Sequence, residues 1–129
     1  GLIESVKDLC DSLKATHAYT IRFYHQFFAE EILPDNLKLT LFRIVQEQFN
    51  SILRHAAAST ILIRLQNDND QLVMSISDNG KGFDPAQQKK GLGLTNIMNR
   101  AELFNGIADI KSQPGRGCSL VVTIPLQNL

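Results

Sequence analysis

The sequence predicts an α+β domain, built as a two-layer α/β sandwich with a mixed, mostly antiparallel sheet and helices packed on one face. Three observations predict this fold. Apolar residues recur at helical spacing in three segments, residues 2–14, 36–57 and 92–105. Alternating apolar residues joined by short polar turns predict strands over residues 60–77 and 107–125. Helices interleaved with hairpins are typical of helices that cover one face of an antiparallel sheet.

The composition suits one ordinary globular domain. The chain has 129 residues, of which 43% are apolar. Thirteen basic and thirteen acidic residues cancel, so the charge gives no general case for nucleic acid or for direct membrane contact. Cys10 and Cys118 are far apart and lack metal-ligand spacing, which indicates reduced thiols in a cytoplasmic domain. No apolar run reaches the length of a membrane span.

The first two predicted elements are a helix and a strand. Residues 1–16 carry an amphipathic helix, which is either a connection from a preceding domain or a plain packing helix. Residues 18–28 alternate and are rich in aromatic residues, so they predict a strand. Its predicted inner face carries Ile21, Phe23, His25 and Phe27. His17 and His25 have no cysteine or acid placed to complete a metal site and are interpreted as ordinary strand residues.

A long helix follows over about residues 36–57, with Asp35 as its predicted N-cap. One side of this helix is apolar. The opposite side carries a polar stripe of Arg43, Glu47, Asn50, Ser51 and Arg54. The stripe is either a solvated helix face, with an ion pair between Arg43 and Glu47, or a site. As a site it offers an acid for proton transfer, oxygens for a metal and a guanidinium for phosphate.

Two hairpins supply the rest of the sheet. The first joins residues 60–66 to residues 72–77 through a polar turn. The second joins residues 107–112 to residues 118–125 through a turn at residues 114–117, which is interpreted as structural. Leu120, Val122 and Ile124 share one face of the last strand.

Asp78 ends the strand at residues 72–77 and begins the first of two glycine motifs. Gly80 and Gly82 follow it, and glycine lets a flat ring approach the backbone closely. A carboxylate in such a pocket can accept a hydrogen bond from the exocyclic amine of adenine. The alternative is an ordinary tight turn, because Asp-Gly and Asn-Gly turns are common.

The second glycine motif, Gly91 to Thr95, begins the helix at residues 92–105. Free N–H groups and the helix dipole attract phosphate at a helix N-terminus, and Thr95 adds a hydroxyl donor. Residues 84–90 bridge the two motifs. They form either a lid, from which Lys89 or Lys90 reaches a phosphate, or an exposed loop.

Together these motifs resemble the GHKL ATPase superfamily, and most closely the catalytic ATP-binding (HATPase_c) domain of bacterial two-component sensor histidine kinases that act through NarL-type response regulators. The resemblance covers roughly residues 18–126, within an assigned domain of residues 17–129. Four motifs carry it in the order of the family: an N-box helix at Leu41 to Ala56, a G1 box at Asp78 to Phe83, a G2 box at Gly91 to Leu94, and an ending from Pro114 to Leu126. The resemblance implies the Bergerat fold.

The resemblance also implies a function. The domain would bind ATP with Mg²⁺ and present the γ-phosphate to a histidine on a separate dimerisation domain, with a response regulator as an indirect partner. None of the three histidines of this chain lies in an acid-flanked helix, so the acceptor histidine would lie outside it. A serine-directed GHKL kinase that acts on an anti-sigma-type partner is another interpretation.

The roles that the resemblance implies fall at two ends of a nucleotide. At the base, Asp78 would bind the adenine amine, Gly80 and Gly82 would shape the pocket, and Thr123 would support the base. At the phosphates, Glu47 would help to activate the attacking group or to organise the magnesium shell. The remaining phosphate-end residues are Arg54, His55, Lys90, Gly91, Gly93, Leu94 and Thr95.

One position departs from the family pattern. The N-box usually has a magnesium-binding asparagine four residues after its acid, and Ser51 stands there. Asn50 lies one residue earlier, about 100° around the helix. Either residue could serve the metal, Ser51 through water or Asn50 from the side. The alternative is a degenerate GHKL module with weak or no Mg-ATP binding, which acts as a regulatory interaction domain.

Overall fold

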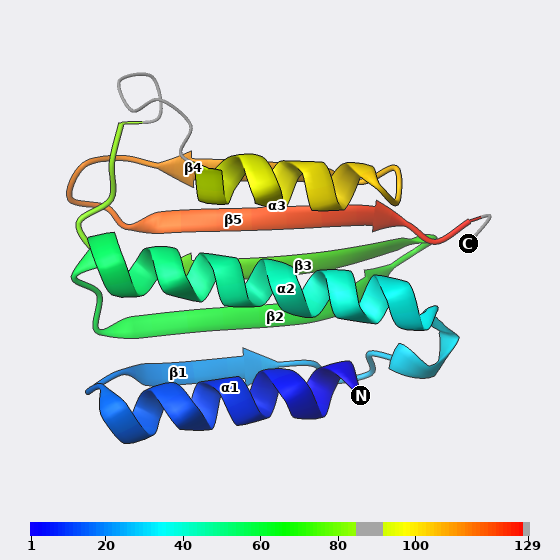
Figure 1. Ribbon diagram of the computed structural model, residues 1–129, viewed down its shortest axis with the longest axis horizontal. Helices are drawn as coiled ribbons and strands as arrows, with labels where there is room; N and C mark the ends of the chain where they lie inside the picture. The colour runs from blue at the N-terminus through cyan, green and yellow to red at the C-terminus, as the bar shows by residue number, and fades with distance from the viewer. Residues whose placement is uncertain (85–91, 128–129) are drawn as a thin grey trace.

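The computed structural model describes residues 1–84 and 92–127. Within them, strands in the order β1-β2-β3-β5-β4 form a five-stranded sheet, and α1, α2 and α3 lie together on one face of it (Figure 1). The predicted α+β sandwich is therefore confirmed. The elements are α1 (Leu2–Thr16), β1 (Thr20–Tyr24), the 3₁₀ turn η1 (Glu30–Ile32), α2 (Asp35–Ser51), the π-helical turn η2 (Ile52–Ala56), β2 (Thr60–Asp68), β3 (Gln71–Asp78), α3 (Leu92–Glu102), β4 (Ile107–Ser112) and β5 (Cys118–Pro125).

The sheet is mixed, as predicted. β1 pairs parallel to β2, and the other neighbouring strands pair antiparallel. Even-numbered residues of β3 and β5 face the helices, because Ile76 and Leu120 are buried and side chains alternate along a strand. Asp78 and Cys118, which pair with each other at the ends of their strands, share this helix-covered face.

α2 lies across the middle of the sheet, between α1 and α3 (Figure 1). Its apolar side is removed from water almost completely, since Leu37, Leu41, Ile44, Val45 and Phe49 are at most 1% exposed. Burial of such side chains contributes about 1.5–3 kcal/mol each. The packing of α2 therefore fixes where its polar stripe points.

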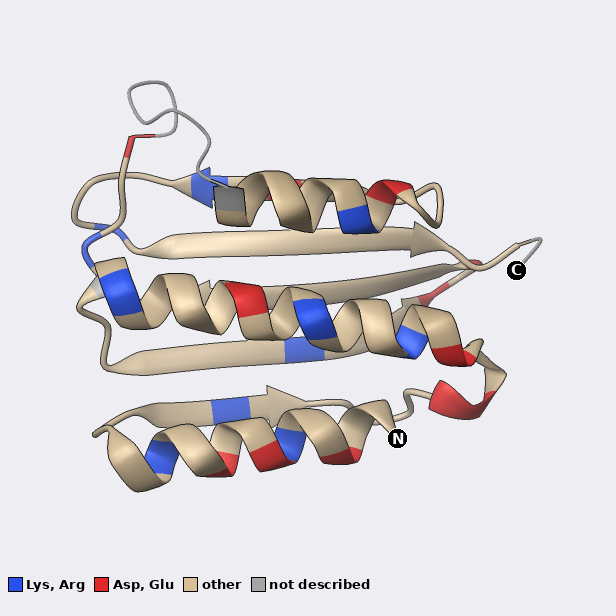
Figure 2. Ribbon diagram, viewed as in Figure 1, with Lys and Arg blue, Asp and Glu red and all other residues tan. Residues whose placement is uncertain are grey.

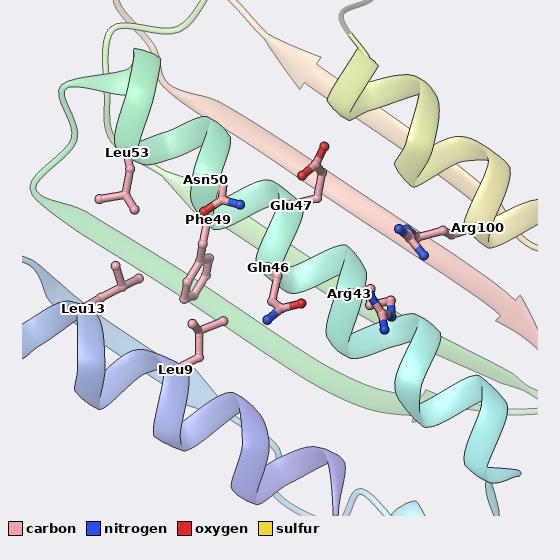
Figure 3. Close-up of a pocket in the computed structure, with 9 residues that line it drawn as sticks. All are labelled: Leu9, Leu13, Arg43, Gln46, Glu47, Phe49, Asn50, Leu53 and Arg100. Atoms are coloured by element: carbon pink, nitrogen blue, oxygen red, sulfur yellow. The ribbon is translucent and has the colours of Figure 1, made fainter.

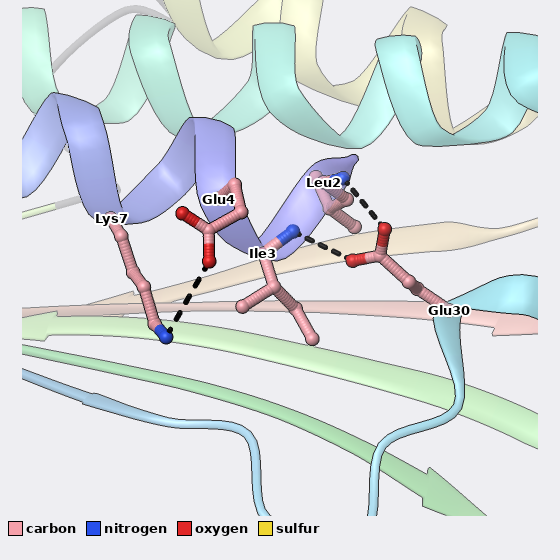
Figure 4. A network of polar contacts seen from close by, with 5 residues as sticks. All are labelled: Leu2, Ile3, Glu4, Lys7 and Glu30. Atoms are coloured by element: carbon pink, nitrogen blue, oxygen red, sulfur yellow. Dashed lines mark hydrogen bonds and ion pairs between the residues drawn. The ribbon is translucent and has the colours of Figure 1, made fainter.

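Glu30 connects the N-terminus of α1 to the segment before α2 through hydrogen bonds. Its two carboxylate oxygens accept hydrogen bonds from the backbone N–H groups of Leu2, at 3.1 Å, and Ile3, at 2.8 Å (Figure 4). A carboxylate also complements the positive end of the helix dipole. α1 packs on the core through Leu2, Val6, Cys10 and Leu13, which are all buried.

Two local predictions were wrong. The strand predicted over residues 18–28 ends at Tyr24, because a turn in which Phe28 N–H donates to the carbonyl of His25 follows it. Phe27 has a left-handed φ of 63° in this turn and is 92% exposed, so it does not share a face with Ile21. Asp35 is not the N-cap of α2: Pro34 holds that position, and its carbonyl accepts from Leu37 N–H and Lys38 N–H.

The long helix predicted to residue 57 changes character before its end. The α-helix stops at Ser51, and Ile52–Ala56 continues as a π-helical turn. Ala57 then takes a left-handed φ of 51°, which ends the helix. Single π-helical turns are frequent at functional sites, and this one carries Arg54 and His55.

The charges are spread over the surface. Figure 2 shows the positions of acidic and basic residues mixed along α1 and α2. None of the helices in the described part of the chain is long and apolar enough to cross a membrane.

Candidate functional site

One end of the domain gathers most of the predicted site residues. β3 ends there, β5 begins there, and the C-terminal end of α2 and the beginning of α3 lie above them (Figure 1). Asp78, Gly80, Gly82 and Gly93 therefore meet at one edge of the fold. Lys89, Lys90 and Gly91 lie outside the described residues, as does the rest of the predicted lid beyond Asp84.

Asp78 is half-buried, and burial raises the pKa of its carboxyl group, while a hydrogen bond from Gly80 opposes the increase. In that bond the Gly80 N–H donates to Oδ1 at 2.8 Å. No described basic side chain forms an ion pair with this carboxylate. Its other lone pairs are thus available to a neutral donor such as an amine.

The Asp78 turn is held on both sides. Asn79 Oδ1 accepts from Ser59 N–H and Thr60 N–H, each at 2.9 Å, so the turn is tied to the beginning of β2. On the other side, Phe83 N–H donates to Ser112 Oγ at 2.9 Å. This structural role of Asn79 was not predicted from the sequence, although asparagine commonly forms turns next to strand ends.

Gly82 touches the turn between β4 and β5. It has a left-handed φ of 63°, and a Cβ placed on it would lie 2.1 Å from the carbonyl oxygen of Gln113. Only glycine fits this close approach. The G1 turn and the β4–β5 turn therefore form one packed unit.

Replacing Gly82 with alanine is expected to lower the free energy of unfolding by more than about 2 kcal/mol, since a left-handed alanine costs ~1–2 kcal/mol and the backbone contact adds to it. Urea denaturation measures the loss. The matched control is Gly115→Ala, because Gly115 also has a left-handed φ, of 78°, but a Cβ there would meet nothing within 4 Å. Equal losses in the two variants would mean that the contact with Gln113 is unimportant.

Glu47 lies over the beginning of α3. A Cβ placed on Gly93 would be 2.9 Å from Glu47 Oε1, so the glycine makes room for the carboxylate. Leu94 and Thr95 follow in the first turn of α3 and are half-buried. A carboxylate and a helix N-terminus thus face each other at this end of the domain, which is a setting that favours a cation between the carboxylate and a bound anion.

The polar stripe of α2 divides by exposure. Glu47 and Ser51 are half-buried on the side of α3, whereas Arg43, Asn50, Arg54 and His55 are exposed. Arg54 Nε donates to the carbonyl of Asn50 at 3.4 Å. The predicted ion pair between Arg43 and Glu47 does not form: between described residues, the ion pairs are Lys7–Glu4 and Lys38–Asp35.

A hollow of about 310 Å³ lies along the outer side of α2 (Figure 3). Glu47 and Asn50 line it, together with Arg43 of α2 and Arg100 of α3, and α1 closes its other side. The Nε atom of Arg100 is buried without a hydrogen bond. Asp78 and its glycines do not line this hollow, so it is separate from the base end of the predicted site.

The role predicted for Thr123 at the base is wrong. Thr123 pairs with Val73, whereas Asp78 pairs with Cys118. Thr123 is five residues farther along β5 than Cys118, on the order of 16 Å away. It also faces the opposite side of the sheet, since its neighbours Val122 and Ile124 are the buried ones.

Cys118 takes the place beside Asp78 that had been assigned to Thr123. Burial, with a smaller contribution from the negative charge of Asp78, raises the pKa of its thiol to about 11. The thiol therefore stays neutral at physiological pH. Gln48 also approaches this end, through its Nε2 atom at 4.0 Å from Cys118 Sγ. The alternation of apolar residues at positions 120, 122 and 124 was the signal in the sequence that could have placed Cys118, and not Thr123, on the same face as the core residues.

Comparison with known proteins finds one matching family and several similar histidine kinases. Residues 36–128 match the family described as histidine kinase-, DNA gyrase B- and HSP90-like ATPase. The chain is 29% identical over 127 residues to the signal transduction histidine-protein kinase/phosphatase DegS of Brevibacillus brevis, covering 98% of this chain and 33% of that protein. It is 32% identical over 127 residues to the sensor histidine kinase LiaS of Bacillus subtilis strain 168, covering 98% and 34%.

Solved structures share the fold at lower identity. The full-length ShkA structure in complex with AMPPNP superposes with a TM-score of 0.79 at 19% identity, over 97% of this chain and 29% of that one. The blue-light activated histidine kinase of Erythrobacter litoralis also gives a TM-score of 0.79, at 17% identity, over 94% and 40%. The chain spans about a third of the length of the curated relatives it matches.

Proposed function

Because this chain belongs to the family of histidine kinase-, DNA gyrase B- and HSP90-like ATPases, we propose that it is the ATP-binding catalytic domain of a sensor histidine kinase. It binds Mg-ATP and presents the γ-phosphate to a histidine on a separate dimerisation domain, in two-component signal transduction. One observation carries the proposal. A half-buried carboxylate, Asp78, and the beginning of α3 at Gly93, next to Glu47, lie at the same end of the domain.

At the base end, Asp78 accepts a hydrogen bond from the adenine amine. The carboxylate already accepts from Gly80 N–H, which fixes its orientation, and a second oxygen remains for the ligand. Gly80 is buried and Gly82 is packed against the β4–β5 turn, so both hold the wall of the pocket. A preorganised acceptor of this kind loses little entropy when the base binds.

At the phosphate end, the backbone of Gly93 and Leu94 and the hydroxyl of Thr95 take the phosphates, helped by Arg54 and His55 from the π-helical turn. Gly91 and Lys90 belong to the same set by resemblance. The free N–H groups of the first turn of α3 supply the donors. Positioning and charge neutralisation account for most of the rate of a phosphoryl transfer, so a rigid helix beginning is a suitable platform.

Glu47, Asn50 and Ser51 fit a magnesium ion, because all three carry the hard oxygen ligands that it prefers. Bound magnesium would supply the positive charge that lets the Glu47 carboxylate and the phosphates lie side by side. Glu47 also orients the attacking group. Ser51 is half-buried on the side of α3, as Glu47 is, while Asn50 is exposed, and this difference favours Ser51 acting through a water.

The names of the relatives support the setting. DegS is named a signal transduction histidine-protein kinase/phosphatase, and LiaS is named a sensor histidine kinase. NreB of Staphylococcus carnosus, 31% identical over 105 residues, is named an oxygen sensor histidine kinase. By analogy the domain is cytoplasmic, works with a NarL-type response regulator through the acceptor histidine, and is joined through residues 1–16 to a preceding domain. The ShkA structure is a complex with AMPPNP, an ATP analogue, which supports ATP as the ligand.

The test is calorimetric titration with ADP and with AMPPNP, in the presence and absence of magnesium. The parent chain is expected to bind both, with a clear dependence on magnesium. Ser51→Asn is expected to bind about tenfold more tightly in magnesium, since a direct ligand replaces a water-mediated one. Ser12→Asn, at an exposed position of α1, is the control and should leave the affinity unchanged.

Each result decides between two functions. Magnesium-dependent binding by the parent chain supports the kinase domain. Binding that occurs only in Ser51→Asn would instead favour a degenerate regulatory module with an intact pocket and one missing ligand. An absence of binding in both proteins would refute the nucleotide-binding function.

A further inference from the structure

Gln48 stands out among the buried residues. It is 4% exposed, and among the described residues it is the one polar side chain in a core of apolar side chains. Its neighbours on the inner side of the helix, Ile44 and Val45 of α2 and Ile52 of η2, are at most 2% exposed. Glutamine is seldom fully buried, because an unpaired amide costs about 1–3 kcal/mol in a protein interior.

The carboxamide of Gln48 is incompletely satisfied. Its Nε2 atom donates to Cys118 Sγ at 4.0 Å, and sulfur is a weak acceptor. Its Oε1 atom accepts no hydrogen bond from a described residue, yet it is not among the fully buried atoms that lack a partner, so it keeps some accessible surface. The amide therefore keeps a small exposed edge and has hydrogen-bonding capacity left for a ligand.

Gln48 approaches the base end of the proposed nucleotide site. Cys118 pairs directly with Asp78 across β5 and β3, and both side chains face the helices. Gln48 reaches toward them from α2, 70 positions away from Cys118 in the chain. A carboxamide from the helix layer and a carboxylate from the sheet layer thus approach the same place from opposite sides.

We infer that Gln48 is a specificity-determining residue, which hydrogen-bonds the adenine ring through its carboxamide while Asp78 binds the exocyclic amine. The inference rests on the proposed function. Adenine presents an amine donor beside ring-nitrogen acceptors, and a carboxylate with a carboxamide N–H matches this pattern. Glutamine also contacts adenine in DNA recognition, where its carboxamide N–H donates to a ring nitrogen, so the same donor suits the role proposed for Gln48. Guanine would turn a carbonyl oxygen toward the Asp78 carboxylate and be repelled.

The experiment combines a protein variant with altered ligands. Gln48→Met has nearly the same volume and shape but no hydrogen-bonding group. Affinities of the parent chain and the variant are measured by calorimetry for ATP, 1-deaza-ATP and 7-deaza-ATP, which lack one ring nitrogen each. In the parent chain, one of the two analogues is expected to bind about tenfold more weakly than ATP. In Gln48→Met, that difference is expected to disappear.

Two further variants make the result decisive. Gln46→Met, at an exposed position of the same helix, should keep the discrimination of the parent chain. Gln48→Asn keeps a buried amide but is too short to reach the base, so it should lose the discrimination as Gln48→Met does. Circular dichroism checks that each variant is folded.

Purine riboside triphosphate, which lacks the exocyclic amine, separates the two proposals. Tighter binding of ATP than of this analogue by the parent chain supports the role of Asp78. With that result in hand, the inference about Gln48 is wrong if neither deaza analogue binds more weakly than ATP. It is also wrong if the weaker binding of the deaza analogue persists in Gln48→Met, because Gln48 would then only pack the core. If the parent chain binds none of the four nucleotides, the proposed function itself fails, and the inference fails with it.

Discussion

Asp78→Asn is expected to weaken ATP binding by about 10- to 100-fold, because hydrogen bonds to a charged group contribute about 1.5–3 kcal/mol. The substitution removes the negative charge that faces the adenine amine and replaces one acceptor oxygen with a donor. Calorimetric titration with AMPPNP and magnesium measures the loss. The shape of the pocket should be preserved, since the remaining amide oxygen can still accept from Gly80 N–H.

Asp109→Asn is the matched control, because Asp109 is an exposed residue of β4 on the opposite face of the sheet from the helices. It removes the same charge from the domain and should leave the affinity unchanged. A similar loss in both variants would trace the effect to net charge. Unchanged binding in Asp78→Asn would remove Asp78 from the site.

Asp78→Asn is expected to weaken ATP binding but to raise the free energy of unfolding of the nucleotide-free domain at neutral pH. Burial raises the pKa of Asp78 in the folded state, so the folded chain binds its proton more readily than the unfolded chain. The parent chain therefore loses stability as pH rises from the unfolded pKa, about 3.9, through the higher folded value. Asp78→Asn should be more stable than the parent chain at pH 7 in the absence of nucleotide, and this advantage should vanish near pH 3.

Phe49→Ala is expected to lower the free energy of unfolding by about 3–5 kcal/mol. Phe49 lies in the last turn of α2, is 1% exposed and is drawn beside Leu9 and Leu13 of α1 (Figure 3), so its truncation leaves a cavity in the core. Urea denaturation at constant pH provides the measurement. A loss of this size is a large part of the stability of a small domain.

Leu103→Ala is the control for this prediction. Leu103 follows α3 and is 75% exposed, so its truncation should change stability by less than about 0.5 kcal/mol. If Phe49→Ala cost no more than Leu103→Ala, the central position of α2 in the core would be wrong.

Much of the fold could be predicted from the sequence, because the apolar periodicity reports burial directly. The segments around α2, β3 and β5 follow that periodicity closely, and their type and order were correct. The pattern says little about which strands are neighbours. The parallel pairing of β1 with β2 depends on contacts between distant segments, and the turn after Tyr24 interrupts a run of aromatic residues that reads as one strand.

Site residues at the end of a strand or the beginning of a helix could be predicted from the sequence. Site residues whose position depends on strand register could not. Asp78 and Gly93 are found at such ends, as expected. Thr123 was assigned by its place in a motif, but strand register and the alternation of side chains put Cys118 beside Asp78 instead. Gln48 was overlooked, although a glutamine three residues after Val45 and four before Ile52 interrupts the apolar side of the helix.

The pairing of β3 with β5 has a kinetic consequence. Ser77 and Ser119, which bond through their hydroxyls next to the Asp78–Cys118 pair, are 42 positions apart in the chain. Closing so long a loop is slow compared with forming a helix or a hairpin. The base pocket is therefore absent from the unfolded chain and exists only once β3 and β5 have paired. A nucleotide that recognises only the finished pocket would slow unfolding and leave the folding rate unchanged, so it would prolong the lifetime of the folded domain without assisting its formation.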